Sequence, residues 1–228
     1  MIDPRDQTLE SFEAYAQTIG VSGRAVRRLY SAVFVRGVYD PAAWGNFFQI
    51  PKILGGRVGI LPRLKLDLIQ ASPVDGFQKL RFLTADGLAI ESVLIPLKKE
   101  GTATLCLSSQ VGCVMGCVFC ATARMAARRN LATWEIIDQW AQARDLAVSQ
   151  GKRISGVVFM GMGEPFLNYD RVITAAELLR SSCGGQISAK AITISTVGLV
   201  PEIDRYTREG HKYRLSISLG AADDEKRA

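Results

Sequence analysis

The sequence is poor in histidine and lacks long apolar runs, and both absences narrow its possible functions. No uninterrupted apolar stretch reaches about 18 residues, so we expect no transmembrane helix and no membrane partner. The N-terminal stretch MIDPRDQTLESFEAY is acidic and polar, unlike a secretory signal peptide. Clustered cysteines without a secretory signal are typical of a reducing compartment, so we predict a cytoplasmic protein.

The composition fits a folded protein with a sizeable core. The chain has 228 residues, of which 48% are hydrophobic and 22% charged, enough for one or two globular domains. Its net charge of +6 is consistent with an RNA partner, although many enzymes are equally basic. Arg24, Arg27 and Arg28 lie close together on a predicted helix, where they form either a solvated face or a phosphate-contacting patch.

Four of the five cysteines are clustered, and Cys113, Cys117 and Cys120 follow the pattern C-x-x-x-C-x-x-C. Thiolates at such short spacing bind soft metals, above all zinc or an iron–sulfur cluster. Structural zinc usually takes four ligands in two separated pairs. Here Cys106 lies seven residues upstream and the single histidine, His211, is distant, so no fourth zinc ligand has the expected spacing. The pattern therefore favours a four-iron cluster with one iron open to a substrate.

A second pattern, GMGEP, spans residues 161–165 and follows an apolar run that predicts a buried strand. Gly161 and Gly163 would let the backbone come close to a ligand, and Glu164 could accept hydrogen bonds from an amino group. Alone, such a pattern could be a plain turn. Its place downstream of the cysteine triplet indicates a ligand site instead.

The first hundred or so residues change from helical to strand-like periodicity. Residues 7–36 predict two helices, the first ended by Gly20 and the second capped by Ser22, and residues 40–62 predict a short helix among glycine turns. Strand-like alternation from residue 65 predicts a β-hairpin with a turn at 85–87 and neighbouring strands that lead into the cysteine loop.

The second half of the chain alternates between helix and strand. Helices are predicted near 133–151, where Thr133 is the expected cap, near 169–182 and near 199–208. Strands are predicted near 154–161, 190–195 and 213–219. This alternation indicates βαβ units around a parallel sheet. In barrels built this way, active sites gather at the C-terminal ends of the strands. We therefore expect the cysteine loop, GMGEP, Ser195 and Ser218 to lie together.

Further motifs accompany these patterns and carry a family resemblance. They are TLCLSSQVGC (104–113), CVFCATA (117–123), FMGMGEPFLNYD (159–170), ITISTVGLVP (192–201) and LSISLGA (215–221). The cysteine triplet resembles the radical S-adenosylmethionine (SAM) superfamily. The whole set, in this order from residue 106 to residue 221, resembles the RlmN/Cfr family of RNA adenosine methyltransferases.

The resemblance implies an α/β fold built on a partial (β/α) radical SAM barrel. It predicts a small N-terminal helical domain resembling an RNA-binding domain over residues 1–62, a β-hairpin extension over 63–102 and the barrel core over 103–228. The family's partial barrel has six strands and we count four here, so the resemblance implies a C-terminally truncated core. The family's methylated cysteine would lie in the missing part, and Cys183 does not match it by motif.

The resemblance also implies the cofactors and their ligands. Cys113, Cys117 and Cys120 would bind a [4Fe–4S] cluster, whose open iron would chelate SAM. The residues implied to line the SAM site are Gly163, Glu164, Ser195, Ser218, Leu219 and Gly220. The family usually has histidine where this chain has Gly220.

In the family, one SAM methylates the C-terminal cysteine, and a second SAM yields a radical that takes hydrogen from that methyl group. The resulting carbon radical adds to adenine. Cys106 matches the cysteine that resolves the protein–RNA adduct through a disulfide, and Glu91 matches the proton acceptor. From the residues alone, a buried strand cysteine is the lesser alternative for Cys106, whereas an outward-facing strand glutamate is an equal alternative for Glu91.

The implied substrate is C2 of an adenosine in 23S rRNA and in certain tRNAs, with electrons from a donor such as flavodoxin or ferredoxin. We favour this RlmN activity because it is the housekeeping one. The alternatives are a Cfr-type enzyme that methylates C8, a radical SAM enzyme with another substrate, and a non-catalytic RNA- or metal-binding fragment. Because the methyl carrier is expected to be absent, we predict that the chain alone does not methylate RNA.

Overall fold

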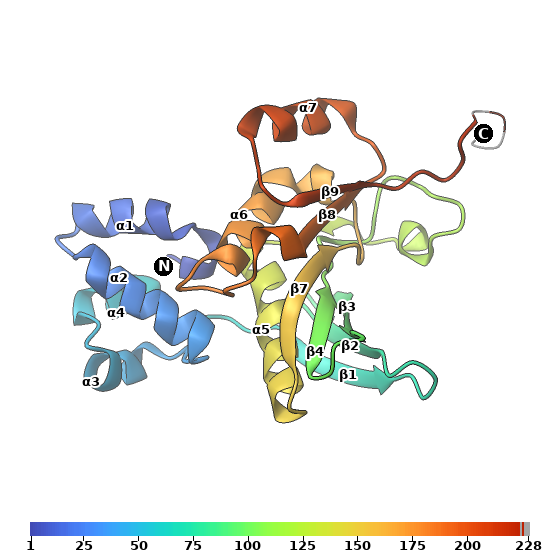
Figure 1. Ribbon diagram of the computed structural model, residues 1–228. Coiled ribbons are helices and arrows are strands. Elements are labelled where there is room, and N and C mark those ends of the chain that lie inside the picture. Colours follow the sequence, from blue (N-terminus) through green and yellow to red (C-terminus); the bar gives the residue numbers. More distant parts are fainter. Residues whose placement is uncertain (224, 226–228) are drawn as a thin grey trace.

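The fold is organised around one seven-stranded sheet, described here in a computed structural model that covers residues 1–223 and 225 (Figure 1). Residues 224 and 226–228, the last of the predicted core, lie outside the described residues. The strands follow the spatial order β1-β2-β3-β4-β7-β8-β9. Their bounds are Lys65–Ala71 (β1), Gln78–Leu83 (β2), Ala89–Pro96 (β3), Thr102–Cys106 (β4), Arg153–Phe159 (β7), Ile192–Thr196 (β8) and Arg214–Ile217 (β9).

The sheet has an antiparallel half and a parallel half that meet at β4. Strands β1, β2 and β3 form a meander, and β3 pairs antiparallel with β4. From β4 onward, β7, β8 and β9 add in parallel, each reached through a helical crossover. The predicted βαβ alternation is therefore confirmed, and the four strands counted in the core are the four parallel ones.

Three helices make these crossovers and lie along the parallel half of the sheet. They are α5 (Thr133–Ser149), α6 (Tyr169–Arg180) and α7 (Val200–Glu209). Leu105, Val157 and Ile192 are fully buried, and they alternate along their strands with less buried neighbours. Ala132 rather than Thr133 is the N-cap of α5, because the Glu135 carboxylate reaches back to the Ala132 N–H at 2.8 Å.

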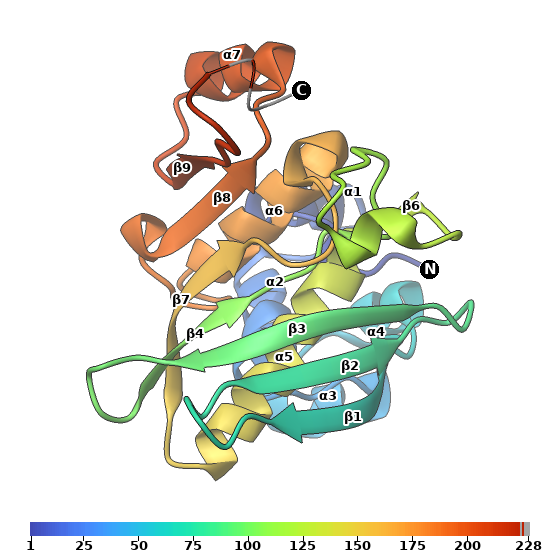
Figure 2. The ribbon, with the colours of Figure 1, turned by 90° about the vertical axis from the view of Figure 1, so that its right-hand side faces the viewer.

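The N-terminal segment forms a layer of short helices on the side of α5 away from the sheet (Figures 1 and 2). The two longest are α1 (Leu9–Thr18) and α2 (Gly23–Tyr30). Ser22 caps α2 by accepting from the Ala25 N–H, as predicted, and Gly20, with φ of +72°, ends α1. The remaining elements are the 3₁₀ turns Pro4–Asp6 and Pro41–Ala43, the π-helical turn Ser31–Val35, α3 (Trp44–Phe48) and α4 (Lys52–Val58).

A buried ion network joins this helical layer to α5. The guanidinium of Arg5, only 1% exposed, binds Asp3 at 2.7 Å and the Pro62 carbonyl at 2.7 Å. It also faces the fully buried Asp138 of α5 at 3.4 Å, and Arg63 binds the same carboxylate at 2.6 Å. Buried charges persist only when paired, so this network fixes how the N-terminal layer sits on α5.

A second polar cluster attaches α7 to α6 on the outer surface. Glu209, near the end of α7, accepts hydrogen bonds from Tyr169 at 2.6 Å and from Arg205 at 2.8 Å, and it contacts His211 at 2.7 Å. The hydrogen bond from Tyr169, followed by those from Arg205 and His211, outweighs burial and lowers the pKa of Glu209 from 4.5 to about 2. Glu209 therefore stays ionised throughout the neutral range.

A small two-stranded sheet closes the cysteine loop beside the main sheet. Strand β5 (Gln110–Val111) enters the loop, the 3₁₀ turn Ala121–Arg124 lies within it, and β6 (Arg129–Asn130) leaves it. Two more 3₁₀ turns, Pro165–Asn168 and Ala189–Ala191, precede α6 and β8. Among the described residues, no helix has the length and apolarity that crossing a bilayer requires.

Candidate functional site

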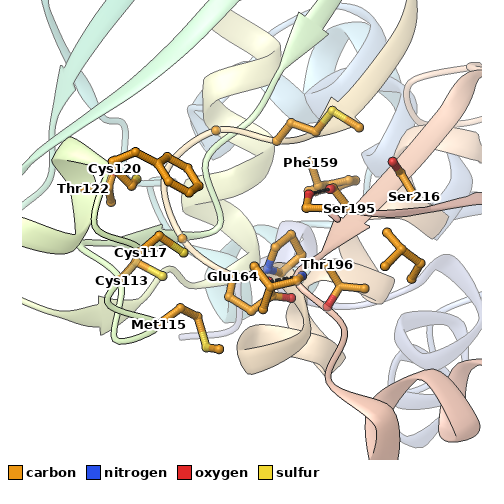
Figure 3. A pocket seen from close by; sticks show the side chains of 18 residues that line it. Cys113, Met115, Cys117, Cys120, Thr122, Phe159, Glu164, Ser195, Thr196 and Ser216 are labelled. Atoms are coloured by element: carbon orange, nitrogen blue, oxygen red, sulfur yellow. Dashed lines mark hydrogen bonds between the residues drawn. The ribbon is translucent and has the colours of Figure 1, made fainter. Parts of the chain in front are cut away.

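A pocket of about 480 Å³ lies where the parallel strands end, beside the cysteine loop (Figure 3). One wall comes from the cysteine loop, a second from the segment after β7, and a third from the ends of β8 and β9. Its lining residues are Cys113, Met115, Cys117, Phe119, Cys120, Thr122, Phe159, Met160, Gly161, Gly163, Glu164, Pro165, Ser195, Thr196, Val197, Ser216, Ile217 and Ser218. The expected gathering of these motifs at the strand C-termini is confirmed.

The three cysteines of the triplet all face this pocket as free, half-buried thiols. The loop turns tightly between the second and third, where the Cys120 N–H donates to the Cys117 carbonyl at 3.0 Å. Burial alone would raise the pKa of Cys120. The N–H groups of Ala123 and Thr122 and the Thr122 hydroxyl outweigh it, so the pKa is lowered. Thiolate character suits a metal ligand.

The donor set can be compared with the ligands that a single zinc ion and an iron–sulfur cluster require. Within the described residues, no three His, Cys, Asp or Glu side chains converge closely enough to hold one metal ion. A structural zinc site needs four ligands around one point. In a four-iron cluster each thiolate binds a different iron, so three thiols spaced along one pocket wall fit that group.

The cysteine loop is clamped at its exit by Arg129. Its guanidinium binds both carboxylate oxygens of Glu135 at 2.8 Å each, and both oxygens of Asp86 at 2.7 and 3.0 Å. Asp86 lies in the turn between β2 and β3, and Glu135 in the first turn of α5. Hydrogen bonds from Arg129 and Thr84 hold the pKa of Asp86 well below its usual range. The loop is thus tied to the turn between β2 and β3 and to the first turn of α5.

The glycines of GMGEP are needed for contacts within the chain itself. A Cβ on Gly161 would lie 2.7 Å from the carbonyl carbon and oxygen of Leu107. A Cβ on Gly163, whose φ is +102°, would lie 2.6 Å from the Cβ of Gln110. The segment entering the cysteine loop therefore packs directly on the GMGEP backbone, a reason for glycine that the sequence did not reveal.

Glu164 is buried, only 2% exposed, and its carboxylate already accepts two backbone hydrogen bonds. One oxygen accepts the Phe166 N–H at 3.0 Å, and the other accepts the Val197 N–H at 2.9 Å. Glu164 therefore joins the segment after β7 to the segment after β8. A carboxylate has about four lone-pair positions, so two backbone donors leave capacity for a cationic ligand group.

Ser195 and Ser218 meet at the strand ends on the far wall. Their hydroxyl oxygens are 3.1 Å apart, and the Ser218 N–H donates to the Thr196 carbonyl at 2.8 Å. Leu219 and Gly220, also predicted to contact SAM, do not line the pocket. Leu219 is 63% exposed, and a Cβ on Gly220 would meet no atom within 4 Å. Their contact with SAM stays a prediction.

Cys106 and Glu91, the two predicted catalytic residues, do not line the pocket. Cys106 ends β4, and its partner across the sheet is Val93 of β3. Glu91 is two residues from Val93, so its side chain shares the sheet face of Cys106. Burial raises the pKa of the Cys106 thiol, while the Glu91 carboxylate pairs with Lys79 at 3.2 Å and is 39% exposed. Their predicted catalytic roles stay predictions.

Sequence reasoning missed the amide side chains that join the pocket walls. Gln110, Asn130 and Asn168 form hydrogen bonds between the cysteine loop and the segment after β7. Gln110 and Asn168 are 6% and 4% exposed, an unusual burial for these residue types. The only signal in the sequence is that each stands inside or beside a motif.

Comparisons with known proteins agree with these features. The family model described as "Radical SAM superfamily" matches residues 107–228. A protein from Myxococcus xanthus named "Probable RNA methyltransferase" is 42% identical over 223 residues, which cover 97% of this chain and 61% of that protein. The "Dual-specificity RNA methyltransferase RlmN" of Syntrophobacter fumaroxidans is 39% identical over 229 residues, covering 98% of this chain and 64% of that protein.

A solved structure extends the similarity to three dimensions. The crystal structure of a radical SAM methyltransferase from Sphaerobacter thermophilus superposes with a TM-score of 0.83 and 34% sequence identity. The superposition covers 97% of this chain and 64% of that one. The chain therefore spans less than two thirds of the length of the relatives named here.

Proposed function

Because the chain belongs to the radical SAM superfamily, we propose that it forms the cluster- and SAM-binding part of an RNA methyltransferase of the RlmN type. The observation that carries the proposal is the convergence of three free thiols, the buried Glu164 and two serine hydroxyls on one pocket at the strand C-termini. The names of similar proteins support RNA as the substrate class.

In this proposal, Cys113, Cys117 and Cys120 hold the [4Fe–4S] cluster as thiolates. The cluster, when bound, supplies the electron that cleaves the sulfonium of SAM. The protein's part is to bind, orient and shield. The buried negative charge of Glu164 complements the ammonium group of SAM, and the hydroxyls of Ser195 and Ser218 offer hydrogen bonds at the opposite wall.

We further propose C2 of adenosine, in 23S rRNA and tRNA, as the methylated atom, with a flavodoxin or ferredoxin as electron donor in the cytoplasm. Cys106 would resolve the protein–RNA adduct through a disulfide, and Glu91 would accept a proton. Their shared sheet face, at and beside the end of β4, supports roles in one reaction. C8 of adenosine is the alternative target.

The proposal is tested by reconstituting the chain anaerobically with iron and sulfide. We expect about four irons per chain, with an iron–sulfur absorption band that the alanine variants of Cys113, Cys117 and Cys120 lose. Cys106→Ala is the matched control and keeps both. Binding of a single zinc ion with no iron–sulfur absorption band would refute the proposal, and loss of the cluster in Cys106→Ala would refute the division of roles.

SAM binding provides the second half of the test. Equilibrium dialysis with the reconstituted chain should show one bound SAM, and Glu164→Gln should weaken it, because the ammonium group loses a buried negative partner. Val200→Ala, at an exposed position on α7, serves as the control. Equal SAM affinity in all three proteins would remove Glu164 from the site.

A further inference from the structure

Three amide side chains fill the space between the cysteine loop and the GMGEP segment. The Gln110 side-chain oxygen accepts the Glu164 N–H at 2.7 Å, and its amide nitrogen donates to the Asn130 side-chain oxygen at 2.7 Å. Asn130 in turn donates to the Leu167 carbonyl at 2.9 Å. Asn168 donates to the Ser109 and Leu131 carbonyls, at 2.8 and 2.9 Å.

These bonds make one continuous path through all three pocket walls. The path starts at Asn130, where the cysteine loop ends, and passes to Gln110, where the loop begins. From Gln110 it reaches the Glu164 backbone, and the Glu164 carboxylate binds the Val197 N–H after β8 at 2.9 Å. Gln110 thus contacts the loop exit through Asn130 and the GMGEP segment through the Glu164 N–H.

The fit around Gln110 is specific to its side chain. Gly163 packs so closely that a Cβ there would lie 2.6 Å from the Gln110 Cβ, and the Gln110 N–H also donates to the Met162 carbonyl at 3.1 Å. Asparagine would be one methylene too short to reach Glu164 from the same backbone. Glutamate could accept from Glu164 but could not donate to Asn130.

We propose that Gln110 is a positioning residue that sets the cysteine loop against the Glu164 and Val197 walls, so that one SAM molecule can reach the cluster and both walls at once. Gln110 does not line the pocket, so it acts through the groups it holds. The inference rests on the proposed function for its ligand, but the wall-to-wall link is a property of the chain alone.

The first test uses the metal-free chain. Hydrogen exchange should be about tenfold faster at the Glu164 and Val197 amides in Gln110→Ala, because Glu164 loses its acceptor and its own carboxylate shifts. Amides in the middle of α5 should exchange as in the wild type. Gln142→Ala is the matched control, since the Gln142 amide also makes two hydrogen bonds, to the Leu64 carbonyl and the Asp138 carboxylate, in the network that joins α5 to the N-terminal layer.

The second test uses the reconstituted chain. Gln110→Ala should retain about four irons and raise the dissociation constant of SAM about tenfold, while Gln142→Ala leaves both unchanged. Gln110→Glu keeps the side-chain volume and the acceptor. It should keep the Glu164 amide protected yet weaken SAM binding, because the bond to Asn130 is lost.

The outcomes separate this inference from the proposed function. A wild-type chain that binds no cluster sinks the proposed function, while the exchange experiment on the metal-free chain still decides the link. Unchanged exchange at Glu164 and Val197, or unchanged SAM affinity, in a folded Gln110→Ala overturns the inference. If Gln110→Ala does not fold, the test rests on Gln110→Glu. A Gln110→Glu variant that binds SAM as tightly as the wild type overturns the inference.

Discussion

Removing the Asp138 carboxylate should detach the N-terminal helical layer from the core. Asp138 lies in the middle of α5 with its side chain fully buried. It faces Arg5 at 3.4 Å and binds Arg63 at 2.6 Å, and it accepts from the Leu64 N–H and the Gln142 amide, both at 2.8 Å. Four donors from three parts of the chain thus depend on one carboxylate.

The magnitude follows from what Asp138→Ala leaves behind. Deleting one partner of a buried ion pair costs about 3–5 kcal/mol. Arg5 would keep Asp3 and the Pro62 carbonyl, and Arg63 is 34% exposed and can turn to water, which moves the cost to the lower end. The Leu64 N–H would lose its acceptor, which costs about 1–3 kcal/mol. These contributions overlap, so we expect a loss of about 3–4 kcal/mol.

Urea unfolding of the full chain, followed by tryptophan fluorescence, measures this loss. The matched control is Asp145→Ala on the same helix, where the carboxylate is 56% exposed and pairs with its neighbour Arg144. An ion pair whose carboxylate faces water contributes about 0–1 kcal/mol. If the two variants lose equal stability, the buried network does not hold the layer, and the reasoning fails.

The local structure could be predicted from the sequence because it depends on neighbouring residues. Ser22 caps α2 through the Ala25 N–H three residues on, and the turn at 85–87 joins β2 to β3. The parallel core followed from helix–strand alternation. The resemblance to the RlmN/Cfr family is confirmed by relatives that match nearly the whole chain.

The environment of α5 could not be predicted in the same way. An amphipathic helix is expected to turn its polar residues to water. In α5, however, Glu135, Asp138 and Gln139 are all buried, because the sheet covers one side and the N-terminal layer covers the other. Asp138 and Gln139 have partners far away in the sequence: Asp138 faces Arg5 at 3.4 Å, and Gln139 accepts from Ser92 of β3 at 2.7 Å. Periodicity carries no information about such long-range pairs.

In the candidate site, too, the sequence identified the residues but not their long-range contacts. The motifs identified the three cysteines, Glu164, Ser195 and Ser218, all of which line the pocket. They did not show that the Glu164 carboxylate binds backbone, or that Leu219 lies outside the pocket walls. Which atoms of a motif face a ligand depends on how distant segments pack, and that is set by contacts such as Gln110 against Gly163.

Three further substitutions test the structural argument. Arg129→Met should lower the free energy of unfolding by about 2 kcal/mol and let thermolysin cut the metal-free cysteine loop faster, because two carboxylates lose their shared partner. Equal cutting rates in the variant and the wild type would contradict the role of Arg129 as a clamp. Glu209→Gln should make the free energy of unfolding depend less on pH between 4.5 and about 2. Ionised Glu209 stabilises the fold above pH 4.5, and this contribution is lost as the pH falls toward 2. An unchanged pH dependence in urea unfolding would refute this prediction. Gly163→Ala should be the most damaging, and Gly198→Ala is its matched control. Both glycines have positive φ, +102° and +109°, so both variants bear a backbone cost of about 1–3 kcal/mol. Only at Gly163 would the new Cβ also meet Gln110, at 2.6 Å, whereas Gly198 has no atom within 4 Å. Urea unfolding should therefore show a larger loss of stability for Gly163→Ala than for Gly198→Ala. SAM binding should also weaken in Gly163→Ala, because the new methyl group pushes apart the two walls that Gln110 holds together. Equal losses of stability would mean that φ alone requires glycine at position 163.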